Sequence, residues 1–317
     1  MVTENMLDYK IPGDSLEKRQ NDMMFLMTPD EKTGYMDGEV YQTLRPYVKD
    51  KHMTQADKYW LGIAYSVSYS CSTAIRFFEE FPDFKNIDFD NMLEFWKAEK
   101  PTMYFNPDKR YLKNMDKVVP AIRNIHQLSG GDLDGYITPL LKQGFNAMYQ
   151  EIINNWRFYG PMGAYLFFDT IWGYSPELIS DPDHLDWFGS GQTVVEGMAH
   201  YLGYDTDIQN KSYREHLDEY NAAAKDISER SGFPLIVVES NLCYLRKFFK
   251  ASRYMGYYAD RELGEYNQVA GILKDKYGVD IWHYRELTCP EELRGELHGW
   301  TGIRKELCNR YLQTGEM

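Results

Sequence analysis

Only one short segment of this 317-residue chain has the composition of a β-strand. Residues 235–238 are rich in β-branched side chains, but four residues cannot build a sheet on their own. Elsewhere apolar residues recur at helical spacing, with Thr54 placed to cap one helix and Pro82 placed to stop another. The sequence therefore predicts an all-α fold.

The helical pattern covers most of the chain after residue 50. No internal repeat and no low-complexity linker divides it, so we expect a single helical domain over residues 51–317. Residues 1–50 are polar and broken by proline and glycine, which predicts an irregular N-terminal arm with one short helix near residues 15–26. The other expected helices cover residues 54–69, 72–81, 90–100, 118–128, 136–158, 161–172, 193–201, 213–228, 235–250, 267–277 and 290–311.

The net charge of −13 argues against a protein that coats nucleic acid through its overall charge. Positive charge gathers enough to hold phosphates in two places, residues 109–117 and residues 246–253. Each of these clusters could equally be an ordinary solvated face. Any nucleic-acid site must therefore be local.

The four cysteines form no CxxC pair, which indicates neither a zinc framework nor a disulfide scaffold. The seven histidines never recur in a metal-ligand pattern. The first residues lack the charged start and apolar run of an export signal, and no stretch approaches the roughly 18 apolar residues of a membrane span. We expect a cytoplasmic protein with no membrane partner.

Residues 239–258 carry an unusual combination of charges on one predicted helix. Glu239, Cys243 and Lys247 fall on one stripe, and Arg246, Lys250 and Arg253 run beside it. A capped surface helix with a solvated charged face would also explain this pattern, because an acid near a helix start suits the helix dipole.

Asp169 is predicted to lie two turns into a helix that begins at the Gly160–Pro161 turn. Its neighbours at helical spacing are Met162, Tyr165 and Trp172, so the carboxylate lies on or beside the apolar face. A charge there is costly without a partner, which makes Asp169 a candidate site residue. An Asp that turns to solvent or caps a neighbouring element is the alternative.

Three segments together resemble the phage amino acid:DNA transferases, also described as the alpha-glutamyl/putrescinyl thymine pyrophosphorylase group. They read WRFYGPMGAYLFFD, VVESNLCYLRKFFK and RYMGYYADRELGEY, and the resemblance covers roughly residues 54–266. The similar positions are Gly160, Pro161 and Asp169 in the first segment, Glu239, Leu242, Cys243 and Lys247 in the second, Gly256, Tyr257 and Asp260 in the third, and Asp108 and Arg110 in an upstream Asp-x-Arg element.

The resemblance implies a helical fold related to helix-hairpin-helix DNA glycosylases. It also implies an enzyme whose partners are double-stranded DNA carrying 5-hydroxymethyluracil pyrophosphate and an amino acid or polyamine that replaces the pyrophosphate. The resemblance also implies a bacteriophage as the source, which would place the protein in the cytoplasm of the host cell. A divalent metal is a possible cofactor, but no ligand set in the sequence requires one.

The implied chemistry assigns roles to particular residues. Asp169 or Glu239 would take the proton of the incoming amine, and Lys247 would act with them in catalysis. The pyrophosphate would be held by Arg246, Lys247 and Lys250 or by Arg110. The remaining substrate-binding residues would be Asp108, Gly160 and the aromatic residues Tyr159 and Tyr257, which would line a pocket for the extruded base.

Two other functions remain open from the residues alone. One is a glycosylase-like base-processing enzyme on the same fold, since one Asp in a helical pocket also suits base excision. The other is a non-catalytic helical nucleic-acid-binding protein, in which Asp169 and Glu239 pair with Arg or Lys inside the core. The identity of the amine is also open.

Overall fold

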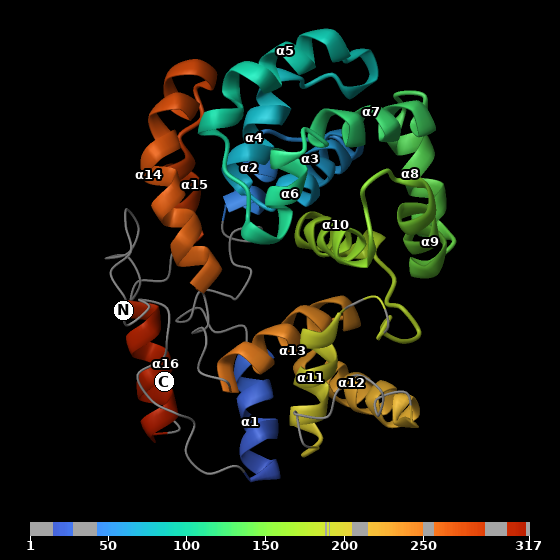
Figure 1. Ribbon diagram of the computed structural model, residues 1–317, viewed down its shortest axis with the longest axis vertical. Coiled ribbons are helices and arrows are strands. Elements are labelled where there is room, and N and C mark those ends of the chain that lie inside the picture. The colour runs from blue at the N-terminus through green and yellow to red at the C-terminus, as the bar shows by residue number, and fades with distance from the viewer. Residues whose placement is uncertain are drawn as a thin grey trace. The chain divides into compact units, whose positions relative to one another are not determined.

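The computed structural model describes residues 15–27, 43–187, 189, 191–204, 215–249, 257–288 and 303–314 (Figure 1). Over these ranges the chain consists of helices and turns and contains no strand, which confirms the all-α fold class. No helix within them combines the length and the apolar character that spanning a bilayer requires.

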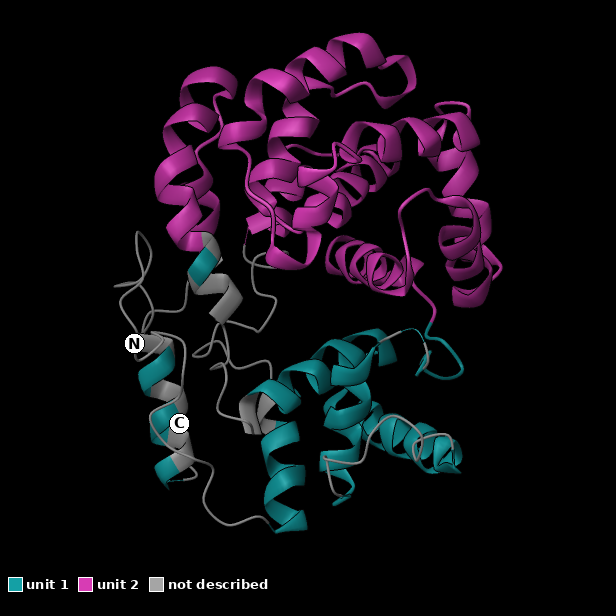
Figure 2. Ribbon diagram, in the orientation of Figure 1, with its two compact units in different colours: residues 1–38, 181–261, 289–317 teal, residues 39–180, 262–288 magenta. Residues whose placement is uncertain are grey.

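The helices form two compact units (Figure 2). Unit 1 comprises residues 1–38, 181–261 and 289–317, and unit 2 comprises residues 39–180 and 262–288. The described helices of unit 1 are α1 (Leu16–Met27), α11 (Gln192–Tyr201), α12 (Leu217–Ser231), α13 (Leu235–Phe249) and α16 (Ile303–Thr314). Those of unit 2 are α2 (Arg45–Asp50), α3 (Gln55–Ser68), α4 (Cys71–Glu80), α5 (Phe89–Glu99), α6 (Arg110–Asn114), α7 (Val118–Ser129), α8 (Leu133–Lys142), α9 (Phe145–Asn155), α10 (Pro161–Tyr174) and α15 (Ile281–Thr288), with most of α14 (Tyr257–Tyr277).

Helix α3 is the centre of unit 2 and contacts α4, α6, α7, α8 and α10. It begins with the predicted cap, because the Thr54 side chain accepts a hydrogen bond from the Asp57 backbone and the Asp57 side chain accepts one from the Thr54 backbone. Every residue from Tyr59 to Ser68 is buried. A helix segment that is buried on all sides is surrounded by other elements, and α3 therefore positions the rest of the unit.

Helix α10 packs closely on α3 because α3 offers a glycine at the crossing. A Cβ atom at Gly62 would lie 2.9 Å from the Cδ1 atom of Ile171. Nearly all of α10 is buried from Gly163 to Ile171, so its position depends on this packing.

The predicted single helix over residues 136–158 is wrong, because the structure forms α8 and α9 there. The break lies at Gly144, whose φ of 106° is readily available only to glycine. The Ser180 hydroxyl then accepts a hydrogen bond from the Phe145 backbone at 3.0 Å and satisfies a donor in the first turn of α9. Pattern alone did not predict α2, α6 or α15, and α14 begins ten residues earlier than expected.

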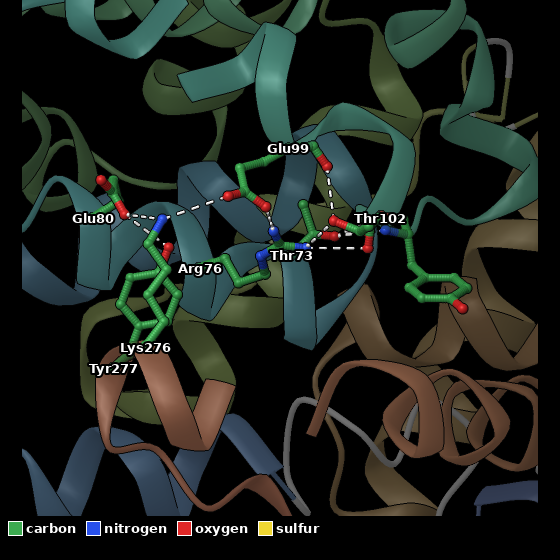
Figure 3. Close-up of polar contacts among 8 residues, drawn as sticks. Thr73, Arg76, Glu80, Glu99, Thr102, Lys276 and Tyr277 are labelled. Atoms are coloured by element: carbon green, nitrogen blue, oxygen red, sulfur yellow. Dashed lines mark hydrogen bonds and ion pairs between the residues drawn. The ribbon is translucent and has the colours of Figure 1, made fainter. Parts of the chain in front are cut away.

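A charged network fastens α14 to α4 and α5 within unit 2 (Figure 3). The fully buried guanidinium of Arg76 on α4 pairs with Glu99 on α5 and donates to the Thr102 carbonyl and hydroxyl oxygens at 3.1 Å. Lys276 on α14 reaches Glu80 at 2.9 Å and Glu99 at 3.6 Å. Glu99 therefore balances cations from two helices.

Helix α13 has the central place in unit 1, where it contacts α1, α11 and α12. Helices α11 and α13 cross so closely that a Cβ atom at Gly197 would lie 2.0 Å from the carbonyl oxygen of Leu242. Leu242 and Leu245 are fully buried, whereas the side chains of Phe248 and Phe249 lie outside the described residues. Lys250 and Arg253 lie outside the described residues, so the alternative of a surface helix with a solvated charged face stays a prediction.

Residues 15–27 of the expected N-terminal arm form α1, which matches the short helix predicted there and packs on α11 and α13. The division into an arm over residues 1–50 and one domain over residues 51–317 stays a prediction.

Candidate functional site

Helix α10 starts at the predicted turn, with Gly160 as its N-cap and Pro161 as its first residue. Gly160 has no side chain to cap the helix, and Pro161 has no backbone N–H. The first backbone bond of the helix runs from the Ala164 N–H to the Gly160 carbonyl at 3.0 Å. The N–H groups of Met162 and Gly163 have no acceptor among the described residues. This end of α10 is therefore a set of uncompensated donors.

Lys109 lies beside this first turn. The residue ends the short 3-10 helix Pro107–Lys109 and is only 4% exposed. Its ammonium lies 5.7 Å from the centre of the Tyr159 ring, and a Cβ atom at Gly163 would lie 3.3 Å from its Nζ atom. Burial lowers the pKa of Lys109 to about 8, and the charge of Asp108 opposes that shift.

Tyr159 is a core residue rather than an open surface for stacking. The residue is 8% exposed, and its hydroxyl lies 2.8 Å from the Ser66 hydroxyl. The Trp156 ring packs edge-on against it at 5.1 Å. Its predicted role in lining a base pocket would therefore require the ring to move.

Asp108 and Arg110 flank Lys109 and are both exposed. Nearby, Lys117 Nζ and Arg157 Cζ each lie 4.9 Å from the centre of the Phe158 ring, and Phe158 itself adopts a φ of 68°. Within the basic cluster at residues 109–117, Lys109 is thus buried, whereas Arg110 is exposed and Lys117 is half-buried.

Asp169 lies in the second half of α10 and is 6% exposed. The prediction that its carboxylate lies on the apolar side is confirmed, and the alternative of a solvent-facing Asp is wrong. Burial raises the pKa of Tyr174 well above its usual value, and the neighbouring Cys71 and Asp169 raise it further. The Tyr174 hydroxyl is buried and has no hydrogen-bond partner among the described residues. Asp169 is therefore an acid in a water-poor environment.

Glu239, Arg246 and Lys247 lie on α13 in unit 1. Glu239 is 8% exposed and belongs to the second turn of the helix. The Arg246 Nε atom donates to Glu196 Oε2 on α11 at 2.6 Å, so the charge of Arg246 is already balanced. The Lys247 ammonium lies 5.3 Å from the centre of the Tyr244 ring. Cys243 donates to the Thr193 hydroxyl at 3.3 Å.

The predicted site residues therefore fall into two sets. Asp108, Arg110, Tyr159, Gly160 and Asp169 belong to unit 2, and Glu239, Arg246 and Lys247 belong to unit 1. Lys250 lies outside the described residues. Tyr257 begins α14, but its side chain is not among those described.

A hollow of about 550 Å³ in unit 2 is lined by Asp57, Asp83, Lys85, Gly131 and Asp132, among others. Its acids serve local structure, because Asp57 completes the cap of α3 and Asp132 caps α8. None of the predicted site residues lines this hollow. Among the described side chains, no group of three His, Cys, Asp or Glu residues is arranged to hold a metal ion.

Comparison with known proteins found no family model that matches this chain, and no curated protein or solved structure with significant similarity. The resemblance to the DNA transferases therefore stays a prediction.

Sequence reasoning included Lys109 in a basic cluster but did not single it out. Its neighbours Asp108 and Arg110 are exposed, and a lysine between two charged residues carries no pattern of burial. The only available signal is the Asn106–Pro107 turn, where the Asn106 side chain accepts from the Asp108 backbone and directs the chain into a tight helical turn.

Proposed function

We propose that this protein is an amine transferase that acts on DNA containing 5-hydroxymethyluracil pyrophosphate. The observation that carries the proposal is the burial of Asp169 on α10, because the resemblance assigns the catalytic acid to this position. A carboxylate kept away from bulk water suits a general base, since water does not compete for the proton that it takes.

The proposed reaction is a substitution at the exocyclic methylene carbon of the modified base. The nitrogen of a primary amine forms a bond to this carbon, and the bond between the carbon and the pyrophosphate oxygen breaks. Pyrophosphate leaves with the electron pair of that bond, and the amine proton passes to a carboxylate. The product is a thymine that carries the amine on its methyl carbon.

We assign the proton transfer to Asp169 in preference to Glu239. Asp169 shares unit 2 with Lys109 and the uncompensated start of α10, where negative charge from a leaving pyrophosphate can be accepted. Arg246, the first cation expected to hold pyrophosphate, is already paired with Glu196. The proposal implies double-stranded DNA and an amino acid or polyamine as partners, and the host cell cytoplasm as the location.

The test is mass spectrometry of nucleosides digested from DNA that bears 5-hydroxymethyluracil pyrophosphate. The DNA is incubated with the full-length protein and a mixture of amino acids and polyamines. We expect a thymidine adduct whose mass names the amine. A released free base would instead identify a glycosylase-like enzyme, and unchanged DNA would overturn the catalytic proposal.

Two conservative variants locate the base. Asp169→Asn is expected to lower the rate of adduct formation at least 100-fold, while circular dichroism still reports a helical fold. Glu239→Gln is expected to retain activity if Asp169 alone takes the proton. The matched controls are Glu94→Gln in unit 2 and Glu229→Gln in unit 1, which change exposed acids on α5 and α12. Full activity of folded Asp169→Asn would remove Asp169 from the mechanism.

A further inference from the structure

The ammonium of Lys109 has no hydrogen-bond acceptor and no ion-pair partner within bonding distance among the described residues. It lies over the Tyr159 ring, and Asp108 acts on it through its charge without a hydrogen bond or ion pair. A buried cation without an acceptor is costly, and proteins rarely keep one without a compensating partner. Among the described residues, the chain itself supplies no negative group that bonds to this ammonium.

The start of α10 lies next to this ammonium and adds further positive charge that no acidic group in the described part of the chain balances. The N-terminus of a helix carries partial positive charge, so a lysine placed there is repelled by the helix. The Met162 and Gly163 N–H groups are unsatisfied, and the Gly163 position is close to the Lys109 Nζ atom. A Cβ atom at Gly160 would meet nothing within 4 Å, so the space at the helix start is open.

We propose that Lys109 and the first turn of α10 form a binding site for a phosphate-class oxyanion. The Met162 and Gly163 N–H groups donate to two of its oxygens, and the Lys109 ammonium supplies the balancing charge. Arg110 follows Lys109 in the chain and is exposed, so its charge helps to attract an anion.

The oxyanion has two possible sources, a free pyrophosphate or a phosphodiester of the DNA backbone. Naming pyrophosphate rests on the proposed function, because that reaction releases it. The site itself does not depend on the reaction. Both sources present the same oxygens to Lys109 and α10, and the experiment below distinguishes them.

The protonation of Lys109 makes the site sensitive to pH. The one charged group that acts on its ammonium among the described residues is Asp108, which favours the protonated form, because burial raises the pKa of the neighbouring Tyr159 above its usual range and keeps that phenol neutral. With a pKa of about 8, the Lys109 ammonium is charged at pH 7 and largely neutral at pH 9.5. Anion binding should therefore weaken as the pH rises through this range.

The test is calorimetric titration of the full-length protein with inorganic pyrophosphate at pH 7. We expect Lys109→Met to weaken binding at least tenfold and Lys142→Met, which removes an exposed lysine at the end of α8, to leave it unchanged. Lys109→Arg keeps a charge at every pH of the experiment and is expected to bind equally well at pH 7 and pH 9.5. The wild-type protein is expected to lose at least fivefold between those values.

A second arm titrates a fluorescent duplex of unmodified DNA into the same variants. If the wild-type protein binds DNA but not pyrophosphate, and Lys109→Met loses the DNA binding, the site holds a phosphate of the DNA backbone. Equal binding of both probes by wild type and Lys109→Met would overturn the site, as would failure of the wild type to bind either probe. If Lys109→Met fails to fold, the pH dependence of the wild-type protein decides the question. Pyrophosphate binding without any DNA adduct would keep the site and reject the transferase.

Discussion

Lys109 costs the folded protein free energy whenever it must carry a proton in the core. In the unfolded chain the lysine takes up its proton near pH 10.5, whereas in the folded protein it does so near pH 8. Between these pH values only the unfolded state binds the proton, so the free energy of unfolding falls as the pH is lowered from 10.5 to 8. Above pH 10.5 Lys109 is neutral in both states, and burying it then carries no cost from its charge. Below pH 8 the cost is constant.

We therefore expect Lys109→Met to be more stable than the wild type at pH 7, by up to about 3 kcal/mol. The difference between the two proteins should shrink as the pH rises from 8 to 10.5. Urea denaturation at pH 7 and at pH 10 measures it, with Lys142→Met as the control for loss of an exposed charge. A constant difference at both pH values would mean that Lys109 is not perturbed by burial.

At the scale of elements, glycine residues where two helices cross determine how closely the helices pack. Helix α13 bears the combination of acid, thiol and cations in the sequence, yet its position is set by contact with α11. The Gly197 position allows the two backbones to meet, and the ion pair between Arg246 and Glu196 joins the same two helices.

Gly197→Ala is expected to destabilise unit 1 by about 1–3 kcal/mol, because the new methyl group would collide with the Leu242 backbone. The matched control is Gly271→Ala on α14, where a Cβ atom meets nothing within 4 Å. This control should be neutral or stabilise by up to about 1 kcal/mol, since alanine favours helices over glycine. Chemical denaturation of both variants gives the comparison, and a neutral Gly197→Ala would mean that the helices separate at little cost.

Most helices could be predicted from the sequence, because caps and apolar spacing are local signals. Thr54 and Pro161 marked true helix starts. The break at Gly144 was missed because a lone glycine in an apolar helical pattern does not by itself reveal a positive φ. The burial of Asp169 followed from its position in an apolar helix, whereas the burial of Lys109 and the pairing of Arg246 depend on contacts between elements distant in sequence.

At the scale of the whole molecule, each of the two units contains buried apolar residues of its own. If the two units open independently, hydrogen exchange should report a local loss of stability mainly in the unit in which it occurs. The charged network around Glu99 offers a test in unit 2, and the crossing at Gly197 offers one in unit 1.

Glu99→Gln removes the charge that balances the fully buried Arg76, so we expect it to destabilise unit 2 by about 3 kcal/mol. Lys274→Gln breaks an exposed pair with Asp280 and should cost less than about 1 kcal/mol. Hydrogen exchange with mass spectrometry should show faster exchange in residues 39–180 for Glu99→Gln and in residues 181–261 for Gly197→Ala. Equal acceleration in both units by each variant would show that they unfold together.

The contact between Gly197 and the Leu242 carbonyl also limits how far this sequence can diverge. Val195 and Met198 are buried, but each can exchange for another apolar residue of similar volume. Position 197 has no such freedom while the crossing of α11 and α13 is kept. Distant descendants of this chain should therefore share little overall identity in unit 1 and yet retain this glycine, which makes it a better marker of common ancestry than the charged residues nearby.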